Sequence, residues 1–242
     1  MWDNMCNKVI LVTGAGSGIG NALVKQLANA GATVIAVARK EQQLKELVEC
    51  DPEHIKPLLL DLSNWDNVRE VLSAVPQLDG LVNNAGVAII KPFEQLTESD
   101  FDTHFDVNIK AVFNVTQSVL PKMRNGSSIV NVSSIAASRS FAGHTAYSAT
   151  KAAVDSLTKS LALELGPRQI RVNSVNPTVV LTRMGRDNWS EPAKSGPLLA
   201  HIPLNRFCEV HEVTDAIAYL LSEKSSFVNG HHINLEGGYS VS

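Results

Sequence analysis

The sequence contains few cysteines, few aromatic residues and no excess of positive charge. Its three cysteines are widely spaced, which argues against a disulfide framework or a zinc site and favours a reducing compartment. Aromatic residues make up 5% of the chain, and 24 acidic residues outnumber 21 basic ones. Stacking platforms and a phosphate-neutralising surface are therefore both lacking, and we expect no nucleic-acid partner.

Long apolar runs are also missing. The first apolar run, residues 9–12, is too short for the core of a signal peptide, and none approaches the length of a membrane span. We therefore expect no membrane span and a cytoplasmic location. The 242 residues and 44% apolar content predict one globular domain, residues 1–242.

Short apolar segments alternate with amphipathic ones along the chain. Strands are predicted at residues 9–12, 33–38, 56–60, 80–83, 128–132, 170–175 and 230–235. Helices are predicted at residues 19–30, 41–49, 65–74, 99–123, 145–165 and 210–221. Apolar strands joined by helices are typical of a parallel sheet covered on both faces. The predicted fold class is α/β: a single-domain Rossmann-type doubly wound parallel sheet of about seven strands, with helices on both faces.

One long stretch, residues 177–206, follows neither pattern. It is interrupted by Pro177, Pro192, Pro197 and Pro203, and by two glycines. A long irregular loop inside a compact domain is usually functional. We predict a substrate loop or lid here, with a plain surface excursion as the alternative.

The first predicted strand leads directly into a glycine-rich turn with the pattern T-G-x-x-x-G-x-G, and then into a helix. Backbone N–H groups at a helix start bind anions, and glycines let a pyrophosphate come close. The turn therefore predicts a dinucleotide site, although a tight turn without a ligand is the alternative. The expected contacts come from Gly14, Ser17, Gly18, Ile19 and Gly20.

The end of the second strand carries Arg39 and Lys40, where an NAD-binding site would place a carboxylate. Two cations suit a ribose 2′-phosphate, so NADP(H) is the predicted cofactor, and two solvated charges are the alternative. After the third strand, Asp61 is placed either at the adenine or in the N-cap region of the next helix, with Leu62 beside it. Further cofactor contacts are expected at the fourth strand, where amides could also join neighbouring strands, from Asn83, Ala85 and Gly86.

A serine, a tyrosine and a lysine form the candidate catalytic set. Ser134 follows the fifth strand, and Tyr147 and Lys151 lie one turn apart on a predicted helix. An ammonium beside a phenol favours the phenolate, so we expect a lowered pKa for Tyr147. Such a phenol can donate a proton to a carbonyl oxygen that Ser134 polarises.

The order of these motifs resembles the short-chain dehydrogenase/reductase family over the whole chain. The resemblance implies catalytic roles for Ser134, Tyr147 and Lys151, and a water-holding role for Asn108 in a proton relay. It also implies that Tyr147 and Lys151 contact the cofactor. Nicotinamide-side contacts are implied at Pro177, Thr178, Val180 and Thr182.

Two departures from the family pattern concern the cofactor. Thr178 stands where many members have glycine, and Ser17 stands where many NADP-binding members carry a basic residue. The nicotinamide-side contacts are therefore open to change, and the predicted NADP preference depends on Arg39 and Lys40.

Within the family, the segments around residues 173–180 and 188–192 resemble the dicarbonyl/L-xylulose reductases. By this resemblance His144 and Trp189 border the substrate, with a loop histidine and a lid anchor as the alternatives. An apolar wall would favour diketones over long polyols. The complete predicted substrate set is Ser134, Ile135, Phe141, His144, Tyr147 and Trp189.

The predicted activity is NADPH-dependent reduction of a small ketone, α-dicarbonyl or ketose such as L-xylulose, giving the alcohol. A 3-oxoacyl-carrier-protein reductase and a non-catalytic NADPH-binding redox sensor are the alternatives. The family implies a homotetramer that packs through small residues of the Tyr147 helix, with internal packing as the alternative. These residues are Ala146, Ala149, Ala152, Ala153 and Ser156. No metal site is expected at His231-His232, because adjacent strand residues point to opposite faces.

Overall fold

The computed structural model describes residues 5–242, apart from the side chains of Met184, Asn188 and Lys194. Its seven strands pair in parallel in the order β3-β2-β1-β4-β5-β6-β7. The strand bounds are β1 Val9–Thr13, β2 Thr33–Ala38, β3 Ile55–Leu59, β4 Leu78–Asn83, β5 Met123–Val132, β6 Arg171–Pro177 and β7 His232–Leu235. The predicted single doubly wound sheet is confirmed.

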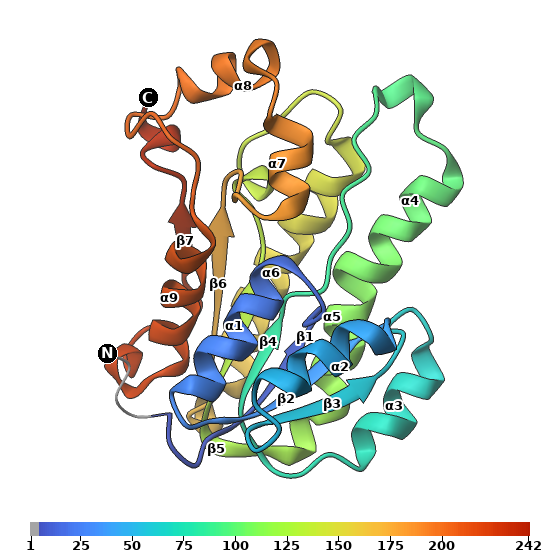
Figure 1. Cartoon of the computed structure of the whole chain (residues 1–242), viewed down its shortest axis with the longest axis vertical. Coiled ribbons are helices and arrows are strands. Elements are labelled where there is room, and N and C mark those ends of the chain that lie inside the picture. The colour runs from blue at the N-terminus through green and yellow to red at the C-terminus, as the bar shows by residue number, and fades with distance from the viewer. Residues whose placement is uncertain (1–4) are drawn as a thin grey trace.

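Helices cover both faces of the sheet (Figure 1). Their bounds are α1 Gly18–Asn29, α2 Glu41–Cys50, α3 Trp65–Ser73, α4 Glu98–Phe105, α5 Ala111–Val119, α6 Thr145–Leu165, α7 Arg183–Trp189, α8 Pro192–Leu199 and α9 Val210–Leu221. Successive residues of β1 face opposite layers, as strand geometry requires. Ile10 and Val12 join one apolar cluster with α1 and α9, whereas Leu11 joins a second with α3, α5 and α6.

The helix predicted at residues 99–123 is confirmed as far as residue 119, but it is not a regular α-helix. The chain forms α4, then one π-helical turn at Asp106–Lys110, then α5, and a 3₁₀ turn at Leu120–Lys122. Apolar spacing continues through all of these segments, so the pattern does not reveal the extra residue that a π turn accommodates. That turn carries Asn108.

The irregular stretch predicted at residues 177–206 contains two helices, α7 and α8. Thr182 caps α7 by accepting a hydrogen bond from Gly185 N at 3.1 Å. Pro192 is the first residue of α8, a position where the missing N–H of proline costs nothing. The proline that suggested a loop therefore marks a helix start. Figure 1 shows α7 and α8 above the carboxyl ends of β6 and β7.

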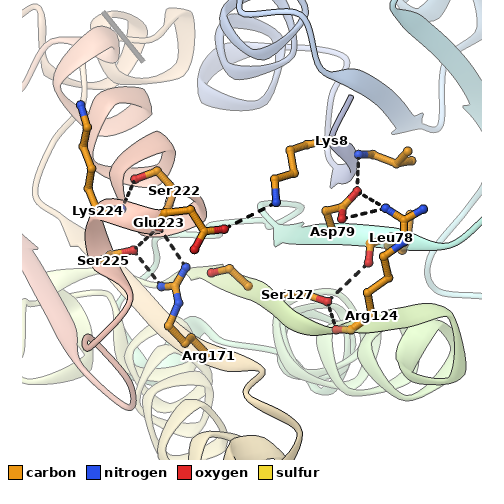
Figure 2. Close-up of polar contacts among 12 residues, drawn as sticks. Lys8, Leu78, Asp79, Arg124, Ser127, Arg171, Ser222, Glu223, Lys224 and Ser225 are labelled. Atoms are coloured by element: carbon orange, nitrogen blue, oxygen red, sulfur yellow. Dashed lines mark hydrogen bonds and ion pairs between the residues drawn. The ribbon is translucent and has the colours of Figure 1, made fainter. Parts of the chain in front are cut away.

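The opposite edge of the sheet, where the strands begin, holds a network of paired charges (Figure 2). Asp79 accepts from Val9 N at 2.8 Å, and both of its carboxylate oxygens accept from Arg124 Nη1 at 2.8 Å. Arg171 donates to carbonyls at the end of α9 and to Ser225 Oγ. These contacts connect β1, β4, β5, β6 and α9, and so hold the base of the sheet.

Two simpler predictions concern the chain as a whole. Within residues 5–242, none of the helices has the length and apolar character to cross a membrane. Cys6, Cys50 and Cys208 are free thiols, so the sheet is held without a disulfide among them.

Candidate active site

The glycine-rich turn after β1 lies against the turn after β4. Gly14 has φ +65°, and a Cβ there would stand 2.8 Å from Ala85 Cα. Asn84 Nδ2 donates to the carbonyls of Thr13 and Gly14 at 3.0 and 3.1 Å, and Thr13 Oγ1 accepts from Ala85 N at 3.1 Å. Only glycine can occupy position 14, because the backbone of Ala85 comes too close for a side chain. The two turns therefore form one surface at the carboxyl edge of the sheet.

The start of α1 suits an anion. Gly18 has φ +56°, and a Cβ at Gly20 would collide with the Gly14 carbonyl. Within residues 5–242, the Ser17 side chain makes no capping bond, and the first turn holds no acidic residue. First-turn N–H groups beside small residues are the features that bind a pyrophosphate, so this chain fits a dinucleotide here. Thr182 Cγ2, at the start of α7, would lie 3.3 Å from a Cβ at Gly18.

Arg39 and Lys40 are exposed at the end of β2, beside this turn. Asp61 accepts from Ser63 N and Ser63 Oγ at 3.0 and 2.8 Å, and these bonds, with a smaller effect of Arg39, lower the pKa of Asp61. The N-cap of α3 is Asn64 rather than Asp61. Leu62 is 9% exposed, and its contact with an adenine remains a prediction.

Asn83, at the end of β4, is buried and joins neighbouring elements. Its Nδ2 donates to Thr116 Oγ1 at 3.1 Å and to Asn131 Oδ1 at 2.9 Å. The predicted stitching of neighbouring strands is therefore confirmed for Asn83. Its Oδ1 has no hydrogen-bond partner among the described residues. Contacts of Asn83, Ala85 and Gly86 with a cofactor remain predictions.

Ser134, Tyr147 and Lys151 are brought together where β5 ends and α6 begins. Ser134 is the N-cap of the 3₁₀ turn Ile135–Ala137, and its Oγ accepts from Ala136 N at 3.1 Å. Burial raises the pKa of Tyr147, although a hydrogen bond with Ser134 opposes this. The hydroxyl and the phenol are thus placed to meet one substrate oxygen.

The expected lowering of the Tyr147 pKa is wrong for this structure. Lys151 Nζ lies 5.6 Å from the centre of the phenol ring and donates to the Val132 carbonyl at 2.8 Å. Burial lowers the pKa of Lys151 to about 8, while Asp155 raises it. Because the ammonium is directed at a carbonyl, the loss of solvation dominates at the phenol.

Asn108 lies in the π turn between α4 and α5. Its Oδ1 accepts from Val87 N at 2.8 Å, and its Nδ2 donates to Val87 O at 2.9 Å and Thr150 Oγ1 at 3.2 Å. A Cβ at Gly86 would lie 3.4 Å from Asn108 Oδ1 and 3.7 Å from Lys151 Nζ. The geometry therefore brings Asn108, Gly86 and Lys151 together, with the Asn108 side chain fixed by protein groups.

His104 is a site residue that the sequence analysis missed. It is fully buried, its Nδ1 contacts Asp100 O at 2.7 Å, and its Nε2 accepts from Ile89 N at 3.0 Å. Its ring lies edge-on to Tyr147 at 6.3 Å, and His144 lies edge-on at 6.1 Å. The Tyr147 ring thus contacts two imidazoles. No local spacing marks His104, because its approach to Tyr147 depends on the packing of α4 against α6.

Two of the predicted substrate residues, Phe141 and His144, lie beside Tyr147, whereas Ile135 and Trp189 pack against other parts of the protein. Phe141 packs on His144 at 5.6 Å and on Tyr239 at 5.7 Å, so Phe141, His144 and Tyr147 lie together. Ile135 is 3% exposed and belongs to the interior. Trp189 packs against Phe207 at 6.1 Å, which agrees with the alternative of a lid anchor.

The residues predicted to contact the nicotinamide half of the cofactor lie at and after the end of β6. The Pro177 carbonyl accepts from Ser134 Oγ at 3.4 Å. Thr178 N donates to Leu235 O at 3.0 Å, and Val180 forms a β-bridge with Cys208. Together with Thr182 at the start of α7, these residues run from Ser134 toward Gly18, along the carboxyl edge.

Comparison with known proteins agrees with this geometry. A family model described as enoyl-(acyl carrier protein) reductase matches residues 14–240. The chain is 48% identical to the L-xylulose reductase of Mesocricetus auratus, with 96% of each protein covered. It is 47% identical to the D-erythrulose reductase of Gallus gallus, with 96% of this chain and 95% of that protein covered. It is 46% identical to carbonyl reductase [NADPH] 2 of Sus scrofa, with 96% of each covered.

Solved structures extend the agreement to the fold. The structure of a short-chain type dehydrogenase/reductase from Mycobacterium ulcerans superposes with a TM-score of 0.93 and 33% identity, covering 98% of this chain and 91% of that one. The glycine turn, the parallel sheet and the serine, tyrosine and lysine at its carboxyl edge all occur here in the expected order. The chain is therefore an oxidoreductase of the short-chain dehydrogenase/reductase family.

Proposed function

We propose that the chain is an NADPH-dependent reductase of small ketones, α-dicarbonyls or ketoses such as L-xylulose, which would yield xylitol. The observation that carries the proposal is the meeting of Ser134, Tyr147 and Lys151 beside the Gly86 turn. Relatives named as reductases of L-xylulose, D-erythrulose and carbonyls support the substrate class.

The residues of this chain suit NADP(H). The start of α1 would hold the pyrophosphate, Arg39 and Lys40 the 2′-phosphate, and Asp61 the adenine. Lys151 and residues 177–182 would hold the nicotinamide half. When bound, NADPH supplies a hydride to the carbonyl carbon.

Tyr147 is the proposed general acid. Because burial raises the pKa of its phenol, Tyr147 is protonated at neutral pH, the state that a proton donor needs. Ser134 Oγ orients the carbonyl oxygen. Lys151, held by the Val132 carbonyl, stabilises the phenolate left behind and passes on a proton, with Asn108 beside it. Reduction is then expected to slow as Lys151 loses its charge near a pKa of about 8.

Two other functions make different predictions. A reductase of carrier-bound substrates would need a basic docking surface. Arg183 and Arg186 are exposed on α7, while the Lys194 side chain lies outside the described residues. A redox sensor would bind NADPH without turnover, yet binding alone does not require all three catalytic groups. Relatives nearly half identical over 96% of the chain carry reductase names that favour neither alternative.

The direct test compares NADPH and NADH oxidation with L-xylulose, diacetyl, an aromatic ketone and a carrier-bound ketoester. We expect turnover of free ketones with NADPH as the faster cofactor. A faster NADH rate on every substrate contradicts the Arg39 assignment. Exclusive use of the carrier-bound ketoester supports the carrier reductase, and binding without turnover supports the sensor.

We further propose a cytoplasmic homotetramer. Ala149, Ala152 and Ser156 lie on the exposed side of α6, whereas Ala146, another predicted interface residue, is buried. Exposed apolar side chains lie on the neighbouring helices, with Phe101 48% and Phe113 44% exposed. Small residues beside exposed aromatics favour close helix packing between subunits. Light scattering on purified protein tests this, and a monomeric mass contradicts it.

A further inference from the structure

Behind the catalytic residues, a buried polar cluster joins α6, β6 and β7. It consists of Asp155, Ser174, Asn176 and His232. The side chains of Asp155 and His232 are 15% and 19% exposed, and Ser174 and Asn176 are almost fully buried. The proposed mechanism assigns a role to none of them. Asp155 follows Lys151 by four residues on α6, one helical turn further along.

Asn176 connects this cluster to Ser134. Its Nδ2 donates to Asp155 Oδ2 at 2.7 Å and to the Ser134 carbonyl at 3.3 Å. One amide group therefore holds both the carboxylate and the backbone of Ser134. The Asp155 side chain fixes the direction of that amide, because a charge-assisted bond is the stronger of the two.

The hydrogen bonds of Ser174 determine the state of His232. Ser174 Oγ lies 2.7 Å from Asn176 Oδ1 and 3.4 Å from Asp155 Oδ1. Because an amide oxygen cannot donate across the shorter contact, the single hydroxyl proton points to Asn176. The 2.7 Å contact between Ser174 Oγ and His232 Nδ1 then requires a proton on Nδ1. His232 Nε2 is buried with no partner among the described residues, as expected for the bare nitrogen of a neutral imidazole.

A neutral His232 leaves the charge of Asp155 for Lys151. His232 Nδ1 is 3.8 Å from Asp155 Oδ1, and burial lowers the pKa of His232 further than Asp155 raises it. His231 and Lys159 also oppose protonation of His232. Lys159 is exposed to solvent, whereas Lys151 is 5% exposed. Asp155 opposes the loss of charge at Lys151, in an interior where water screens the charges little.

We propose that Asp155 is a positioning residue for the reduction, whose carboxylate keeps Lys151 charged and, through Asn176, holds the backbone of Ser134. The inference rests on the proposed function, since it assumes the roles given to Ser134, Tyr147 and Lys151. It predicts that removing the charge of Asp155 changes the pH range of activity as well as the rate.

The test is the pH profile of kcat/KM for L-xylulose with NADPH in Asp155→Asn, whose side chain has nearly the same shape. We expect the alkaline limb to move by about one pH unit toward acid, because Lys151 loses the anion that opposes its deprotonation. Lys159→Gln, which removes an exposed charge one turn further along α6, should leave the limb in place. A limb that stays in place in Asp155→Asn overturns the proposal, since a purely structural role changes melting temperature and rate alone.

Two further variants of Asp155 cover the remaining cases. Asp155→Ser removes the charge in a smaller volume, and it should show the same limb shift if Asp155→Asn does not fold. Asp155→Glu keeps the charge but displaces it, so kcat should fall several-fold with the limb unmoved. Wild-type turnover by Tyr147→Phe would instead overturn the proposed function. An inactive Tyr147→Phe together with an unmoved Asp155→Asn limb rejects the role of Asp155 alone.

Discussion

The amino and carboxyl edges of the sheet differ in how well their charged and polar groups are paired. At the amino edge, Asp79 is paired with Arg124 and with Val9 N, and Lys8 is paired with Glu223 at 3.6 Å. At the carboxyl edge, the buried ammonium of Lys151 donates to a neutral carbonyl, and Tyr147 is buried enough to raise its pKa.

This contrast separates stability from chemistry. Matched charges and bonded backbone groups lower the free energy of the folded chain, but they leave no capacity for a ligand. Buried groups whose charge is poorly compensated cost stability, and for that reason they can respond to a substrate or cofactor. Variants at the carboxyl edge should therefore change activity first, and variants at the amino edge should change stability first.

The largest effect is expected for Tyr147→Phe. Loss of the phenol proton removes the general acid, so kcat should fall by about 10³-fold. The ring remains packed between His104 and His144, so NADPH affinity and melting temperature should stay close to wild type. Steady-state kinetics, NADPH fluorescence titration and thermal unfolding measure the three quantities. Wild-type turnover would show that another group supplies the proton.

At the amino edge, Asp79→Ala should reverse this pattern. The variant loses the acceptor of both Val9 N and Arg124, so the free energy of unfolding should fall by about 2 kcal/mol. Urea unfolding measures this, and kcat of the folded enzyme should be unchanged. Glu53→Ala, an exposed acid in the turn before β3, is the control and should have little effect. A loss of kcat without loss of stability would contradict the division between the edges.

Much of the fold could be predicted because its central strands are buried on both faces. Short segments with Val, Ile and Leu identified the strands, and α6 begins and ends at the predicted residues 145 and 165. The glycine turn was equally readable, since Gly14 and Gly20 stand where a Cβ would collide with backbone. Each of these signals can be read from a short segment of the sequence.

Features that depend on distant contacts could not be predicted. The π turn at Asp106–Lys110 keeps the apolar spacing of a helix, and Pro192 is read as a loop unless its place at a helix start is known. The spacing of Tyr147 and Lys151 predicted their approach. The direction of the Tyr147 pKa depended on burial and on the Val132 carbonyl, which no spacing reveals.

A smaller effect is expected for Arg39→Ser, which tests cofactor choice at the carboxyl edge. Loss of an exposed cation should weaken NADPH binding by about ten-fold and leave NADH binding unchanged, because NADH lacks the 2′-phosphate. Fluorescence titration of both cofactors measures the difference. Lys45→Ser, which removes an exposed lysine on α2, should change neither affinity. Equal weakening of both cofactors would show that Arg39 does not read the phosphate.

The smallest effect concerns the pH dependence of stability. Burial lowers the pKa of Lys151 from 10.5 to about 8. Below pH 8 both the folded and the unfolded chain carry this proton, so the cost of the buried charge is fully present. Between about pH 8 and 10.5 the unfolded chain binds more protons, so this cost falls and stability rises with pH.

Lys151→Met removes the charge and isolates this contribution. The variant should be more stable than wild type at pH 7 by about 1 kcal/mol, because the relief of burial exceeds the loss of the bond to the Val132 carbonyl. The advantage should shrink as pH rises from 8 to 10, a range in which the wild-type ammonium deprotonates while folded. Urea unfolding of both proteins across this range measures it. A constant difference would mean that Lys151 keeps its proton in the folded chain, and that the carboxyl edge tolerates a buried charge at less cost than its geometry indicates.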